Sequence, residues 1–115
     1  MKVIFYCPKR ADDILKALFN SKPNSIVMLH NHPGQSGFSE YDLFTFFKHP
    51  SIKSMTIVTN KGQVKFITKS NRFHGKIVSK FCAKYFTHIN IINDSHIEKL
   101  LKKLYSINMI KYKVR

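Results

Sequence analysis

The chain has 115 residues, a length typical of one folded domain. Apolar residues make up 43% of it, which is enough for a core and excludes a disordered chain. No stretch approaches the roughly 18 consecutive apolar residues of a membrane-spanning helix, so we expect no membrane span. Twenty Lys and Arg residues against six Asp and Glu residues give a net charge of +14. This charge favours polyanions such as nucleic acid as partners, although scattered lysines also fit an ordinary solvated surface.

The pattern of apolar and turn-forming residues predicts alternating strands and helices. In chain order, the expected elements are a strand over 3–7, a helix over 11–20, a strand over 25–29, a helix that Ser39 opens and that ends before 49, strands over 55–59 and 64–67, and helices over 76–88 and 95–105. The run 25–29 is continuously apolar and bounded by turn residues, which is typical of a buried central strand. The order β-α-β-α-β-β-α-α predicts an α/β fold, of the α+β type with a mixed sheet. We expect a single domain over 1–115, with 70–115 as a helical C-terminal extension.

A candidate metal site follows the predicted buried strand. His30 and His32 lie two residues apart at its C-terminal end, so their side chains point the same way. Asp42 lies in the first turn of the next predicted helix, from which its carboxylate can reach back to the strand end. Two imidazoles and one carboxylate leave the fourth position of a tetrahedral zinc ion open to water, as in catalytic sites. Zinc lowers the pKa of such water to about 7, and the hydroxyl of Ser39, the expected N-cap, could hydrogen-bond a substrate oxyanion.

Each of these residues also has an ordinary interpretation. A His-x-His pair is common by chance, and an Asp in a first helical turn usually complements the helix dipole. The order and spacing of the four candidates, with Pro33 and a loop of Gly and Ser between them, favour a metal site over coincidence.

The segment from His30 to Asp42, which reads HNHPGQSGFSEYD, resembles the His-x-His-Pro…Ser-x-x-Asp motif of the JAMM/MPN+ (JAB) zinc metallopeptidases. That family includes deubiquitinating isopeptidases, prokaryotic relatives and RadC-like proteins. The form found here is most similar to prokaryotic and phage JAB domains, including those attached to phage head-morphogenesis proteins, over about residues 23–68. The resemblance implies a JAB/MPN-like domain with cytidine-deaminase-like layering. It also implies that His30, His32 and Asp42 bind Zn²⁺ and that Ser39 stabilises the tetrahedral intermediate.

The chain departs from the family pattern at the general base. Members carry a catalytic Glu on an early strand upstream of the His-x-His pair, whereas no Glu precedes Glu40 here. The acids upstream are Asp12 and Asp13 at a predicted helix start, and Glu40 is expected to point away from the metal. Loss of a general base costs about 10²–10⁴ in rate. Three interpretations stay open: metal binding without useful activity, a base supplied by a partner chain or by one of the two aspartates, or an active enzyme whose frame is shortened at its N-terminus.

Two functions of different classes are therefore expected. The first is a zinc-dependent peptidase or isopeptidase that cleaves an amide bond in a protein or peptide, such as one next to a ubiquitin-like tail. The alternative is a catalytically dead JAB module that binds a protein partner or nucleic acid through its basic surface. The candidates for that surface are the basic residues of the C-terminal part: Lys99, Lys102, Lys103, Lys111, Lys113 and Arg115. Cys7 and Cys82 lack metal-type spacing and are expected to be free thiols in a reducing compartment. The resemblance implies that this compartment is the cytoplasm of a bacterial or phage-infected cell.

Overall fold

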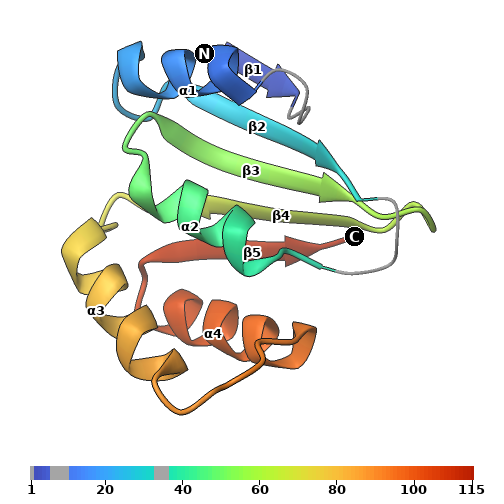
Figure 1. Ribbon diagram of the computed structural model, residues 1–115, viewed down its shortest axis with the longest axis vertical. Coiled ribbons are helices and arrows are strands. Elements are labelled where there is room, and N and C mark those ends of the chain that lie inside the picture. Colours follow the sequence, from blue (N-terminus) through green and yellow to red (C-terminus); the bar gives the residue numbers. More distant parts are fainter. Residues whose placement is uncertain (1, 6–10, 33–36) are drawn as a thin grey trace.

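A computed structural model of the chain describes residues 2–5, 11–32 and 37–115, except for the side chains of 11–13. The helices and strands in these ranges are, in chain order, β1 (Lys2–Phe5), α1 (Ala11–Asn20), β2 (Ile26–Asn31), α2 (Glu40–Lys48), β3 (Ile52–Val58), β4 (Val64–Lys69), α3 (Gly75–Phe86), α4 (Asp94–Ser106) and β5 (Ile110–Val114). They form a single small α+β domain in which helices pack against one mixed sheet (Figure 1). The expected fold class is confirmed at this level.

In the described part of the chain the sheet has five strands in the order β1-β2-β3-β4-β5. β1, β2 and β3 are mutually parallel, whereas β4 and β5 each run antiparallel to the preceding strand. α1 and α2 are therefore crossover helices, and right-handed crossovers that advance in one direction place both on the same face of the sheet. Figure 1 shows α2 lying across this face. The end of β2 and the first turn of α2 are in contact through the side chains of His30 and Asp42. This edge, where a parallel strand ends and a helix begins, holds the candidate site.

The core lies between this face of the sheet and the helices. Its buried side chains are almost all aliphatic, with Phe38 and Phe46 as the largest. α4 is a major contributor, because its buried stripe repeats at helical spacing: Ile97, Leu100, Leu101 and Leu104. The structure contains no helix, within the residues that it describes, that is long and apolar enough to cross a membrane.

The C-terminal part differs from the prediction. Residues 70–115 are not a purely helical extension, because residues 110–114 form β5, which pairs with β4 along its length. The sequence Ile-Lys-Tyr-Lys-Val alternates apolar and basic residues with the period of a strand, and Tyr112 lies on the face that α4 covers. The prediction was wrong because alternation over five residues is a weak signal, and pairing with β4 makes this segment a strand.

The other elements lie close to their expected positions. The helix opened by Ser39 runs over Glu40–Lys48. The strands expected over 55–59 and 64–67 form a hairpin that turns at Gly62, whose φ of 78° favours glycine. The first strand is described over Lys2–Phe5, and the last two residues of its predicted range, Tyr6 and Cys7, lie outside the described residues.

Candidate metal centre

β2 presents the two imidazoles. His30 is the penultimate residue of the strand and pairs in register with Ile57 of β3. His32 follows the strand, and its backbone N–H still donates to the carbonyl of Val58 at 2.9 Å. Because β3 holds the backbone extended through His32, the two side chains project to the same side, and their ring centroids lie 4.5 Å apart in an edge-to-face arrangement.

α2 presents the carboxylate. Ser39 is the N-cap of this helix, and its hydroxyl oxygen accepts a hydrogen bond from the backbone N–H of Asp42 at 3.1 Å. In return, the backbone N–H of Ser39 donates to Oδ2 of Asp42 at 2.9 Å. This reciprocal pair is a capping box, and it fixes both the start of the helix and the orientation of the carboxylate.

The three side chains converge on one point. Oδ1 of Asp42 lies 3.1 Å from Nδ1 of His30, and Oδ2 lies 3.1 Å from Nε2 of His32. The side chains of His32 and Asp42 are only 9% and 10% exposed, and that of His30 is 22% exposed. The sequence thus correctly predicted that these three residues lie together, at the end of a strand and the start of a helix.

The arrangement fits a metal ion. A zinc ion about 2.0 Å from each ligand atom in tetrahedral geometry would separate those atoms by about 3.3 Å. The two nitrogen–oxygen distances are of this size, and each ends on a different oxygen of Asp42. One ligand atom from each of His30, His32 and Asp42 lies within 4.8 Å of the others. A small cavity of about 40 Å³ borders His30 and Asp42, which is room for a water-sized group. These three residues could therefore hold a metal ion, with nitrogen and oxygen donors of the kind that zinc accepts.

Comparisons with protein-family models, curated proteins and solved structures find no match to this chain. The resemblance to the JAMM/MPN+ motif consequently stays a prediction from sequence.

Ser39 is the N-cap of α2, as predicted from the sequence, and the reciprocal bond that completes a capping box was not predicted. Its hydroxyl accepts the hydrogen bond that caps α2, and both partners of the capping box belong to the candidate site. The Ser-x-x-Asp spacing was the available signal, since a capping box uses this spacing. Stabilisation of a substrate oxyanion by the Ser39 hydroxyl stays a prediction.

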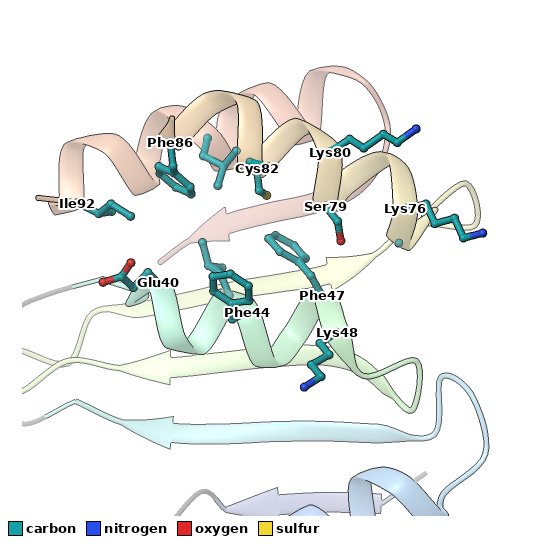
Figure 2. A pocket seen from close by; sticks show the side chains of 14 residues that line it. Glu40, Phe44, Phe47, Lys48, Lys76, Ser79, Lys80, Cys82, Phe86 and Ile92 are labelled. Carbon is teal, nitrogen blue, oxygen red and sulfur yellow. The ribbon is translucent and has the colours of Figure 1, made fainter. Parts of the chain in front are cut away.

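No further carboxylate joins the three ligand candidates among the described residues. Glu98, on α4, accepts hydrogen bonds from Nζ of Lys65 at 3.0 Å and from the hydroxyl of Tyr112 at 2.5 Å. Burial and this carboxylate raise the pKa of Tyr112 far above its ordinary value. Glu40 lies along a groove between α2 and α3 (Figure 2). The side chains of Asp12 and Asp13 lie outside the described residues.

The predicted basic surface is divided between two elements. Lys99, Lys102 and Lys103 are exposed on α4, and Nζ of Lys103 lies 5.9 Å from the ring centre of Tyr85. On β5, Tyr112 faces α4 because its hydroxyl bonds Glu98, so the neighbouring lysines of the strand project from the opposite face of the sheet. The residues on that second face, all exposed, are Lys111, Lys113 and Arg115.

Among the residues that the structure describes, one lysine is buried, which was not predicted from the sequence. Lys69 is 3% exposed, and its Nζ donates to the carbonyl of His49 at 2.7 Å. The same nitrogen lies 5.0 Å from the ring centres of both Phe46 and Phe73. Burial, with a smaller contribution from Lys53, lowers the pKa of Lys69 to about 8. The signal in the sequence was the alternation on β4, which puts Lys65, Ile67 and Lys69 on one face.

Proposed function

We propose that this chain is a zinc-dependent hydrolase of amide bonds, with His30, His32 and Asp42 as the zinc ligands. The observation that supports this most strongly is the convergence of two imidazoles and one carboxylate, with ligand atoms within 4.8 Å of one another. Zinc bound there would act as a Lewis acid and lower the pKa of a coordinated water to about 7. The substrate class, a protein or peptide amide such as an isopeptide next to a ubiquitin-like tail, rests on the motif resemblance, as does a setting in the cytoplasm of a bacterial or phage-infected cell.

In this proposal each residue of the chain has a defined task. Asp42 supplies the anionic ligand and is held by the backbone N–H of Ser39. The capping hydrogen bond, which the Ser39 hydroxyl oxygen accepts from the backbone N–H of Asp42, keeps the helix start rigid, so the carboxylate needs little reorganisation when the ion binds. We assign the stabilisation of a substrate oxyanion to the hydroxyl of Ser39.

A second function is favoured because, among the described residues, no further carboxylate that could act as a general base joins the metal ligands. Glu98 is engaged with Lys65 and Tyr112, and the described part of the chain offers no other carboxylate in the metal group. A metal-holding module without a general base would act by binding a protein or a polyanion. Its contact surface would be the basic face of β5, which includes Lys111 and Lys113.

The first experiment is the zinc content of the purified protein after reconstitution and dialysis, in wild type and in the variants His32→Ala and Asp42→Ala. The control is His74→Ala, because His74 is exposed at the start of α3 and makes no side-chain capping bond. We expect one zinc per chain in wild type and control, and strong loss in both ligand variants. Wild-type protein that retains no zinc would refute the metal site.

The second experiment separates the two functions. Zinc-loaded protein is incubated with peptide and isopeptide-linked substrates, with the Asp42→Ala variant as the inactive reference. Amide cleavage that the variant lacks supports the hydrolase. If zinc is held but no substrate is cleaved, the binding module is favoured, and it predicts polyanion binding that weakens with salt and is lost in Lys111→Glu/Lys113→Glu.

A further inference from the structure

A large groove separates α2 from α3, away from the metal ligands. Its volume is about 860 Å³, within the range of small-molecule sites. The walls are mostly apolar: Leu43, Phe44 and Phe47 come from α2, and Cys82 and Phe86 come from α3. Figure 2 shows these aromatic rings lining the space between the two helices. Phe44 is 71% exposed, so in this structure an aromatic wall of the groove meets solvent.

The two ends of the groove differ in charge. Figure 2 shows Glu40 at one end and Lys48 and Lys76 at the other. The basic end adjoins a second cavity of about 450 Å³, which shares Lys48 with the groove and is also lined by Lys53 and Lys69. No acidic residue of the described chain lines this second cavity. An apolar channel that opens among several lysines is complementary to a ligand with an apolar chain and an anionic head.

The length of the groove sets the length of that chain. Glu40 and Lys48 are the first and last residues of α2, eight residues apart, so the helix extends about 12 Å between them. With carbon–carbon bonds near 1.5 Å, an extended alkyl chain of about ten carbons spans this distance. The single basic end suits a ligand with one anionic head.

We propose that the groove between α2 and α3 binds a free single-chain fatty carboxylate of about ten carbons, with its chain along Phe44 and Phe47 and its carboxylate among Lys48, Lys76 and the adjoining lysine-lined cavity. The site shares no residue with the proposed zinc ligands. Its occupation can therefore be tested in metal-free protein, and failure here is separate from failure of the hydrolase.

The test is calorimetric titration of the full chain with octanoate, decanoate and dodecanoate, and with decanol as the uncharged match. Each methylene that the groove buries should strengthen binding by about fourfold, and the gain should stop once the chain exceeds about ten carbons. Decanol should bind at least tenfold more weakly than decanoate, and only decanoate binding should weaken as salt is added.

Two variants and a control locate the ligand. Ala83→Trp fills the groove from α3 at an exposed position and should abolish binding, and Lys48→Gln/Lys76→Gln should weaken decanoate but not decanol. Lys84→Gln is the matched control, because Lys84 is exposed on α3 but does not line the groove. If Ala83→Trp unfolds, protection of Cys82 from alkylation by decanoate, in a Cys7→Ser background, locates the ligand instead.

Three results would overturn the proposal. The first is equal affinity for decanoate and decanol, which would remove the role of the lysines. The second is decanoate binding that neither the Trp variant nor the alkylation assay places in the groove. The third is no binding of free decanoate. In that case, binding of anionic phospholipid vesicles, or a dimer that Phe44→Glu disrupts, would identify a different occupant of the groove.

Discussion

Replacement of Ser39 by Ala tests whether the capping box holds the metal ligand in place. The change removes the acceptor for the backbone N–H of Asp42 and leaves the hydrogen bond from the backbone of Ser39 to Oδ2. Loss of an N-cap side chain costs about 1 kcal/mol of stability. With an unfolding entropy of about 2.1 cal/mol/K per residue, a chain of 115 residues should unfold about 4 °C lower. Because Asp42 keeps one of its two anchors, zinc affinity should fall by about tenfold, the lower end for groups that orient a ligand.

The assay is thermal unfolding of metal-free protein together with competitive zinc titration. Ser39→Asn is the matched variant, because Asn caps helices as well as Ser does but lacks the hydroxyl. We expect Ser39→Asn to recover both the unfolding temperature and the zinc affinity. An unfolding temperature for Ser39→Ala within 1 °C of wild type would refute the capping argument. If Ser39→Ala loses about 10²–10³ in turnover at full zinc occupancy, the oxyanion role is supported in addition.

Three further predictions concern the core. The pKa of Lys69 falls on folding from 10.5 to about 8, so the unfolded chain binds more protons between these values. From pH 7 to 9.5, Lys69 should therefore contribute about 2 kcal/mol of added stability, measured in chemical denaturation as the difference between the pH dependences of wild type and Lys69→Met. Leu100→Ala removes a fully buried side chain that packs in the core, and should lower the free energy of unfolding by about 2–5 kcal/mol; a loss below about 1 kcal/mol would contradict the assigned burial. Burial raises the pKa of Cys82 to about 11. In a Cys7→Ser background, alkylation of Cys82 at pH 8 should therefore be about 100-fold slower than alkylation of a thiol with the reference pKa of 9.0. Equal rates would show that the thiol is exposed.

Much of the candidate site could be predicted because its geometry is local. His30 and His32 share a side of one strand by the two-residue period, and Asp42 is placed by the first turn of a helix with a recognisable N-cap. The distances between them depend on how the end of β2 and the start of α2 are placed. This placement is set by the connection between a parallel strand and its crossover helix. Only these two neighbouring elements are needed to predict that the three residues lie together, and this prediction is confirmed.

The features that were missed depend on contacts distant in sequence. β5 is a strand because it pairs with β4, whose residues lie more than 40 positions earlier in the chain. Its alternation extends over only five residues and is a weak signal. The ion pair of Lys65 with Glu98 joins residues 33 apart, and Lys69 is buried because Phe46, Phe73 and the His49 carbonyl surround it. Sequence pattern alone places a lysine on the solvent side, and here the tertiary packing overrides that preference.

α2 links the two proposed sites through its two sides. One side carries Asp42, which contacts both imidazoles, and the other carries Phe44 and Phe47, which line the groove. The capping box makes the start of α2 rigid, and a metal ion bound by Asp42 and the two histidines would in addition fix the position of α2 relative to β2. One wall of the groove would then be fixed in place, so less conformational entropy would be lost when an alkyl chain binds. Zinc should therefore strengthen decanoate binding, and decanoate must strengthen zinc binding by the same factor, because coupling between two binding equilibria is reciprocal.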